Sequence, residues 1–503
     1  HRRPRMLALH LLMGVAVGAR HVGRVRPTLM SAVPSRLPAA SQLCDWVASH
    51  GGDVSGVRVC DTSNMGLGLV AARAIRRGDA ILTVPNGLAI TTESALRSEI
   101  LGPYLAEFEP ELADYSFIAV ALLNEERLGD QSPLAPWLSS ASRATSHDLP
   151  LLWPDEAQVE LEQSTAAPFA KRRAAAKADY EWLQANVFDQ SPMVFPSSVF
   201  SEAAFLRAVS EAISHSAYIV PDSADEPARL AMMPLLELAN HAVPPTASTS
   251  FRSASAGFLG RGEAPAAVQL LAIGDIAEGQ AVCTKYADAT QGELLVDYGF
   301  ITEPIPPETS LSFGLNPNDL NLYEKEAILE GANLAPTQAF ILSESEPLPY
   351  ELLSYLRLIH LGPPTTPSDA FLLEALFADS LWREHLPQPI SRQNEAAALQ
   401  LGFDAATEAL LRLRGDLQRD LSTLAEAPRE SCEYRLAAVR YAERRALEAA
   451  AAAFRAELRS LDGLEYYQER RLRMLNLTPI ETEEQLEALR SAGRAMTSED
   501  YDW

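Results

Sequence analysis

The chain has 503 residues, of which 47% are hydrophobic and 22% are charged, and its formal net charge is −25 at pH 7. This length allows two or three domains with full cores, and this composition is that of a folded protein. The acidic excess argues against nucleic-acid binding, which needs a basic face to neutralise phosphates. After the first thirty positions no uncharged apolar run reaches 18 residues, so we do not expect a membrane-spanning body.

The N-terminal segment differs in composition from the remainder of the chain. It contains no acidic residue, seven arginines and an apolar run from Leu7 to Ala19. An acid-free, arginine-rich leader is typical of an organelle transit peptide. We therefore expect residues 1–43 to be a targeting leader, with a disordered extension of a cytosolic protein as the alternative.

The cysteines give no sign of a metal site or a disulfide framework. The four residues are far apart in the sequence and form no CxxC pair; they are Cys44, Cys60, Cys283 and Cys432. We therefore expect no bound metal and a reducing compartment for the mature protein.

The order of predicted elements is strands, a helical insert, strands and a helical module. Residues 44–90 predict a short helix, with Leu43, Trp46 and Val47 on one face, and then small strands separated by turn residues. Residues 91–225 are rich in Ala, Leu and Glu and predict helices, whereas 228–300 return to short strands. After Pro307 the chain is mostly helical. A nucleotide-binding α/β protein would instead alternate strands and helices throughout.

The first motif is Gly66-Leu67-Gly68. It lies between two short strands and not between a strand and a long helix, so it does not fit a dinucleotide-binding fingerprint. Glycines at these positions would let backbone amides and carbonyls approach a ligand closely. Taken alone, the motif is more typical of a tight turn without a ligand.

The second motif is Asn240-His241, which ends an apolar stretch just before a proline-rich loop. An asparagine offers a carbonyl and an amide together, which suits binding of an amino group such as that of a methionine moiety. The histidine would hydrogen-bond a backbone group and hold the turn. Taken alone, the dipeptide is more typical of a helix terminus.

The third motif comprises Tyr286 and, twelve residues later, Tyr298-Gly299-Phe300. Methyl transfer from a sulfonium needs a desolvated, aligned approach of a neutral amine and oxygens around the electron-poor methyl group. Tyrosine hydroxyls supply such oxygens through weak CH···O contacts, and they can orient the lone pair of the amine. Taken alone, Tyr298-Gly299-Phe300 is more typical of a strand end with a core aromatic residue.

In this order, with a helical insert between the first two, the three motifs resemble the split SET domain of the Rubisco large-subunit lysine methyltransferases. The likeness covers residues 44–460, including two C-terminal helical stretches that resemble the substrate-binding module of that family. It implies an α+β fold, with a SET domain of short-stranded sheets and a pseudoknot at 44–300, split by a helical insert at about 91–225. An all-helical substrate-binding domain would follow at 301–463, and then a tail at 464–503.

The resemblance also implies roles for individual residues. Tyr298 would be the catalytic tyrosine, and Tyr286 would line the acceptor channel with it. Phe300 would pack against the adenine of S-adenosylmethionine, the expected cofactor. The remaining cofactor-binding residues would be Met65, Gly66, Leu67, Gly68, Glu237, Asn240 and His241.

The chain departs from the family pattern at several positions. The family commonly has Ser-Arg before an aromatic residue ahead of the middle motif, whereas this chain has Ser214, His215 and Tyr218 but no arginine there. It has Met65 where an acidic residue is usual and Thr290-Gln291 where Ser-Asn is usual.

We interpret the chain as an S-adenosylmethionine-dependent protein-lysine N-methyltransferase. The alternatives are a protein-histidine N-methyltransferase, as in a related branch that methylates actin, a SET-derived binding module without turnover, and a helical scaffold with incidental motifs. The resemblance implies a protein substrate docked by the C-terminal domain, with the Rubisco large subunit and fructose-bisphosphate aldolase as candidates. We expect a monomer in a plastid, with a cytoplasmic or mitochondrial location as the alternative.

Overall fold

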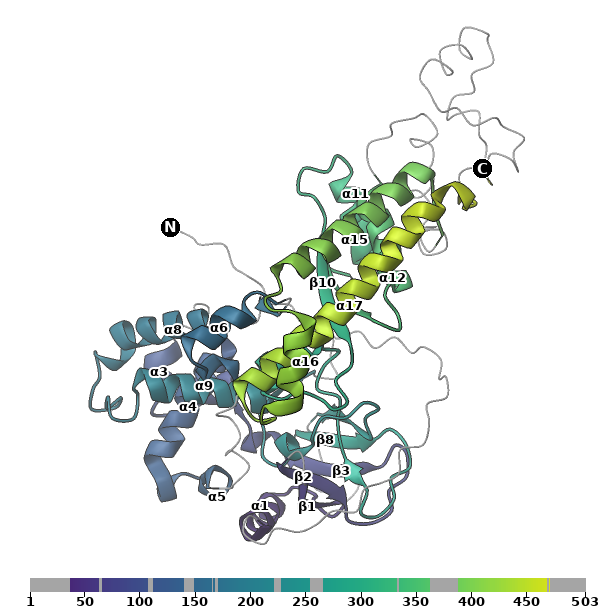
Figure 1. Ribbon diagram of the computed structural model, residues 1–503. Helices are drawn as coiled ribbons and strands as arrows, with labels where there is room; N and C mark the ends of the chain where they lie inside the picture. The colour runs from purple at the N-terminus through teal and green to yellow at the C-terminus, as the bar shows by residue number, and fades with distance from the viewer. Residues whose placement is uncertain are drawn as a thin grey trace, which may run out of the picture.

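The computed structural model describes residues 37–62, 66–106, 112–139, 149–164, 166–167, 171–220, 228–253, 266–332, 334–361, 388–467 and 470. The N-terminal strands and the first group of helices lie at one end of the molecule, and two long helices run from them to the other end (Figure 1). The predicted leader falls outside the described residues up to position 36. Of the predicted tail, only 464–467 and 470 are described.

The first helix begins before the predicted domain boundary. Helix α1 spans Leu37–Ser49, and its Leu43 and Val47 are fully buried while Trp46 packs beside them. Gly51 then takes a left-handed backbone conformation with φ of 88°, which ends the helix. The predicted amphipathic face of this segment is therefore confirmed.

The strands of the N-terminal part form three small antiparallel sheets. Their orders are β1-β2-β9, β3-β8-β7 and β4-β6-β5. The strands are β1 (Val57–Thr62), β2 (Gly66–Ala71), β3 (Ala80–Pro85), β4 (Ile90–Thr91), β5 (Ser216–Ile219), β6 (Arg229–Met232), β7 (Ala247–Arg252), β8 (Ala267–Ala272) and β9 (Ala281–Val282). Each sheet pairs strands from before and after the helical insert, so the two halves of the split domain fold as one body.

The insert is built on helix α4 (Asp114–Leu128), which packs against α9 (Glu202–His215). Nine consecutive residues of α4 are buried, as its apolar sequence predicts. The other helices described here are α2 (Thr92–Arg97), α3 (Gly102–Leu105), α5 (Ala135–Leu138), α6 (Asp155–Leu161) and α8 (Arg172–Leu183), with the 3₁₀ turns η3 (Gly129–Gln131) and η5 (Pro150–Leu152) and the π-helical segment η6 (Gln184–Phe188). The 3₁₀ turn η1 (Asn86–Leu88) precedes the insert.

The C-terminal part is dominated by α15 (Arg392–Arg412) and α17 (Cys432–Ser460), which pack along each other (Figure 1). At Gly402 a Cβ would stand 2.2 Å from Cζ of Phe454, so only glycine permits this close approach. The other described elements of this part are α11 (Leu322–Gly331), α12 (Tyr350–Ile359), α16 (Leu417–Glu426) and the turn η8 (Leu461–Gly463). The turn η7 (Leu236–Leu238) and helix α10 (Gln291–Tyr298) precede it and belong to the N-terminal part.

The C-terminal domain is helical in the main, but it is not entirely so. Strands β10 (Glu308–Gly314) and β11 (Thr337–Ser343) pair in register as an antiparallel ribbon. Leu311 and Phe313 alternate with polar residues along β10 and face the C-terminal core. This period of two indicates a strand, and it is the signal that the prediction of an all-helical domain overlooked.

Three apolar clusters hold the described chain together. The largest fills the N-terminal part, and the second lies between the ribbon and the C-terminal helices. The third joins the two parts, because Leu295 and Val296 of α10 pack with Leu436 and Val439 of α17. Helix α10 therefore lies at the junction of the two domains.

Candidate functional site

Strand β2 carries the first motif and begins in an unusual conformation. Gly66 has φ of 71°, and apart from its chain neighbours no atom of the described residues lies within 4 Å of the place where its Cβ would stand. Its carbonyl accepts a hydrogen bond from Thr62 Oγ1 at 2.7 Å, which closes the β1–β2 turn. The backbone at Gly66 is thus held by Thr62, and no described group fills the space on its outer side.

The second motif packs directly on this strand. Asn240 Nδ2 donates a hydrogen bond to the carbonyl oxygen of Leu67 at 3.2 Å. A Cβ at Gly68 would lie 2.6 Å from the same Nδ2 atom and 2.8 Å from Cγ2 of Thr62. Gly68 is therefore required by protein packing, whereas no described side chain or backbone group fills the corresponding space at Gly66.

The third motif joins the second through backbone pairing. His241 forms a parallel bridge with Thr284, since Thr284 N–H donates to the carbonyl of Asn240 and Ala242 N–H donates to that of Thr284, both at 3.0 Å. The N–H of Tyr286 donates to Nδ1 of His241 at 3.2 Å. These contacts bring the two segments together, as the predicted pseudoknot requires.

Four rings meet at this point. The centroids of Tyr286 and Tyr298 are 4.6 Å apart, and His241 lies 5.3 Å from Tyr286 and 5.8 Å from Phe300. Phe300 is also 6.1 Å from Tyr286 and 6.4 Å from Tyr298. The structure thus brings together both predicted channel tyrosines, the predicted adenine-packing residue and the histidine of the second motif.

Tyr298 is the last residue of a helix and does not end a strand. Helix α10 begins with a capping box, in which the side chain of Thr290 accepts from Glu293 N–H and the side chain of Glu293 accepts from Thr290 N–H. Gly299 ends it in the left-handed conformation, with φ of 78°. Gln291 Oε1 accepts from Thr302 N–H at 2.8 Å, which anchors the chain beyond Phe300 to the start of the helix.

Burial controls the protonation of the cluster. It raises the pKa of Tyr286 and of Tyr298 well above the usual range, and for Tyr298 the adjacent Asp297 carboxylate raises it further. Burial also lowers the pKa of His241, and the charge of Lys285 lowers it further. Near neutral pH both phenols are therefore protonated and the imidazole is neutral, so that Nδ1 is free to accept the Tyr286 N–H.

Two predicted cofactor-binding residues remain, Met65 and Glu237, and the charge of Glu237 acts on the Tyr286 hydroxyl. Met65 lies outside the described residues. Glu237 Oε1 accepts a hydrogen bond from Nε1 of the fully buried Trp137, on helix α5 of the insert, at 2.7 Å. This carboxylate therefore links the insert to the second motif, a contact across 100 positions that the sequence analysis did not foresee.

Sequence reasoning also missed the surroundings of Tyr298. Arg172 at the start of α8 forms an ion pair with Asp297, and its charge and that of Asp297 both act on the Tyr298 hydroxyl. Tyr218 of strand β5 lies close enough to the same hydroxyl to affect its pKa. Helices and strands of the insert thus form one side of the site.

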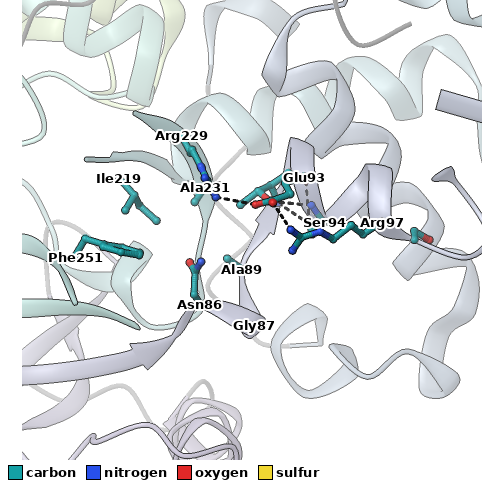
Figure 2. A pocket seen from close by; sticks show the side chains of 12 residues that line it. Asn86, Gly87, Ala89, Glu93, Ser94, Arg97, Ile219, Arg229, Ala231 and Phe251 are labelled. Atoms are coloured by element: carbon teal, nitrogen blue, oxygen red, sulfur yellow. Dashed lines mark hydrogen bonds and ion pairs between the residues drawn. The ribbon is translucent and has the colours of Figure 1, made fainter. Parts of the chain in front are cut away.

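A cavity of about 350 Å³ lies beside strands β4, β5 and β6 (Figure 2). Glu93 stands between two arginines, Arg97 and Arg229, and forms an ion pair with each at 2.5 and 2.8 Å. Ile219 and Phe251 provide apolar lining. None of the predicted site residues lines this cavity, so it is separate from the four rings of His241, Tyr286, Tyr298 and Phe300.

Neither metal-ligating groups nor membrane-spanning segments were found in the described ranges. There, no three His, Cys, Asp or Glu side chains come together as a metal ion would require. None of the described helices is both long enough and apolar enough to span a bilayer.

Comparisons with known proteins agree with this geometry. A family model described as Rubisco LSMT substrate-binding matches residues 316–447. The chain is 29% identical to the chloroplastic [fructose-bisphosphate aldolase]-lysine N-methyltransferase of Arabidopsis thaliana, over 90% of each protein. It is 28% identical to the chloroplastic Rubisco large-subunit N-methyltransferase of Pisum sativum, over 88% of this chain and 87% of that protein.

A more distant relative is the actin-histidine N-methyltransferase of Homo sapiens, 23% identical over 76% of this chain and 62% of that protein. Among solved structures, the SET domain of LSMT bound to lysine and AdoHcy superimposes with a TM-score of 0.65 and 27% identity. The match covers 91% of this chain and all of the other. The sequence comparison and the structure comparison therefore match nearly the whole chain to the same group of methyltransferases.

Proposed function

We propose that the chain is a SET-domain protein methyltransferase of the Rubisco large-subunit methyltransferase-like family and that it methylates the ε-amino group of a lysine in another protein. The observation that carries the proposal is the packing of Tyr286 on Tyr298, with ring centroids 4.6 Å apart, beside a strand held by Asn240. This arrangement provides a desolvated aromatic wall next to an open stretch of glycine backbone.

The residues around Gly66 fit a methyl donor of the S-adenosylmethionine type. The outer side of Gly66 is open, and the side chain of Asn240 offers amide and carbonyl groups beside it. When bound, the donor supplies an electrophilic methyl group on a positively charged sulfur. Leu67, Gly68 and His241 would complete its binding site, and the ring of Phe300 would pack against its adenine.

Tyr286 and Tyr298 would act on the acceptor amine as hydrogen-bonding groups and not as bases. Their raised pKa values keep both phenols protonated near neutral pH, so neither takes a proton from lysine. The amine must lose its proton to water before it enters, and burial among aromatic rings favours its neutral form. The Tyr298 hydroxyl would then orient the nitrogen lone pair towards the methyl group.

The C-terminal domain would dock the protein substrate, as the name of the matched family model states for its family. The chloroplastic relatives and the arginine-rich leader together support a plastid location. Fructose-bisphosphate aldolase and the Rubisco large subunit are the first substrates to test, because the relatives in Arabidopsis and pea are named after them.

The test is incubation with labelled S-adenosylmethionine and three acceptors: chloroplastic aldolase, Rubisco, and an extract of the source organism. Mass spectrometry of the labelled protein should locate the methyl group on a lysine. Tyr298→Phe should reduce the rate by about a hundredfold, because the hydroxyl that orients the amine is lost. Tyr104→Phe is the matched control, since this tyrosine lies on α3 of the insert and the substitution keeps the ring that packs on Phe195, so the rate should be unchanged.

Two outcomes would contradict the proposal. Label on a histidine would identify the acceptor as the one named for the actin-specific relatives. Binding of S-adenosylmethionine without labelling of any acceptor would instead identify a protein that recruits partners without turnover.

A further inference from the structure

One ion pair connects the helical insert to the residue before the tyrosine expected to be catalytic. Asp297 is the penultimate residue of α10, and its Oδ1 accepts from a guanidinium nitrogen of Arg172, the first residue of α8. The two side chains are 18% and 25% exposed, so solvent screens the pair only in part. The contact spans 125 positions of sequence.

The two charges act in opposite directions on the Tyr298 hydroxyl. Apart from burial, the Asp297 carboxylate raises the pKa of this phenol and the Arg172 guanidinium lowers it. Because Asp297 directly precedes Tyr298 and Arg172 pairs with it, both charges lie near the position at which the acceptor amine would stand. The net charge of the pair is close to zero only while both side chains are present.

Other titratable groups act on the residues next to this position and not on the Tyr298 hydroxyl itself, with the exception of Tyr218. On the insert side these are Asp114, Tyr115, Asp179 and Tyr218. On the side of the strands they are Glu237, His241, Cys283 and Lys285. Thr92 donates to the carboxylate of Asp114, Ser116 to that of Asp179 and Trp137 to that of Glu237. A change at Arg172 or Asp297 leaves these partners in place.

We propose that Arg172 is a positioning residue for the acceptor site: it neutralises Asp297, so that the lysine amine beside Tyr298 stands there uncharged. This inference rests on the proposed function. Only a neutral amine has the lone pair that forms the new N–C bond as the S–C bond breaks. The sulfur leaves as a neutral thioether, and the positive charge passes to the methylated nitrogen.

Without Arg172, the carboxylate of Asp297 would stabilise the unreactive ammonium form. The pKa of the bound amine then rises, and the rising limb of kcat against pH moves to higher pH. For a single charge near a buried amine we expect a shift of about one pH unit. At a fixed pH on that limb, a shift of this size is a loss of about tenfold in kcat.

The test measures kcat from pH 6 to pH 10 with labelled S-adenosylmethionine and the protein acceptor identified by labelling. Arg172→Gln should move the limb to higher pH and Asp297→Asn should move it to lower pH. The double variant should return it close to that of the wild type, because the two charges are then removed together. Arg172→Lys should keep the wild-type limb, since it retains the positive charge.

Lys177→Gln is the matched control, because this residue lies on the same helix and pairs with Glu202. The same loss of charge there should leave the limb in place. If Arg172→Gln folds poorly, two other variants still test the inference. The rising limb of kcat against pH should move to lower pH in Asp297→Asn and stay in place in Arg172→Lys.

Superimposed limbs for the wild type and the charge-changing variants would overturn the inference alone. Equal loss of kcat at every pH would give Arg172 a purely structural role and would also overturn it. A wild type that labels no acceptor would overturn the proposed function, and this inference with it.

Discussion

Replacement of Gly68 by alanine tests how the first and second motifs are held together. The new Cβ would stand 2.6 Å from Nδ2 of Asn240 and 2.8 Å from Cγ2 of Thr62. Carbon atoms do not approach other heavy atoms this closely, so the Asn240 side chain must move. Its hydrogen bond to the carbonyl of Leu67 would then be lost.

The expected cost follows from these two contacts. Overpacking of a tight site costs about 1–3 kcal/mol, and a lost hydrogen bond costs about 1 kcal/mol. We therefore expect Gly68→Ala to lower the free energy of unfolding by about 3 kcal/mol and the melting temperature by roughly 5 °C. Since Asn240 is displaced, the affinity for S-adenosylmethionine should fall by at least about tenfold, equivalent to 1.4 kcal/mol.

The assays are thermal unfolding and calorimetric titration with S-adenosylmethionine. Gly274→Ala is the matched control, because no described residue other than its chain neighbours comes within 4 Å of its Cβ position and its backbone is not left-handed. It should leave both measurements unchanged. If Gly68→Ala unfolds and binds as the wild type does, the packing of Asn240 on strand β2 does not govern this site.

Three further outcomes are expected. Gly402→Ala should lower the melting temperature of the C-terminal helices because of the clash with Phe454, whereas affinity for S-adenosylmethionine should be retained. Arg440→Gln should destabilise the protein by about 3 kcal/mol in chemical unfolding, because it leaves the fully buried carboxylate of Asp420 without its cation. The pKa of His241 is lowered mainly by burial, so below about pH 6.5 the unfolded chain binds its proton first. Stability measured from pH 8 to pH 5 should therefore fall as the pH drops, and less so in His241→Asn.

The predicted SET fold is confirmed. It could be predicted from the sequence because the patterns that indicate its helices and strands are local and recur along the chain. The apolar run of α4 and the face of α1 that carries Leu43 are recorded in the spacing of residues. The end of α10 was also recorded locally, in the capping-box pair Thr290 and Glu293 and in Gly299. The interpretation of Tyr298-Gly299-Phe300 as typical of a strand end did not take this pattern into account and was wrong.

The remaining contacts of the site were beyond local reasoning. The pair of Arg172 and Asp297, like the bond from Trp137 to Glu237, joins residues more than 90 positions apart. No periodicity or turn signal records which charged residues meet after the insert folds back on the strands. These contacts follow from tertiary packing, which a single sequence does not determine by pattern.

The third apolar cluster bears on how docking and catalysis are connected. Leu295 and Val296, just before Tyr298, pack on the N-terminal half of α17, whose other half belongs to the C-terminal core. Arg440 on the same helix also pairs with Glu160 of the insert. A helix that is shared in this way cannot shift without moving the wall on which α10 rests. The domain that matches a substrate-binding family is thus a structural part of the site itself, and removal of α17 would expose the apolar face that fixes the helix of Tyr298.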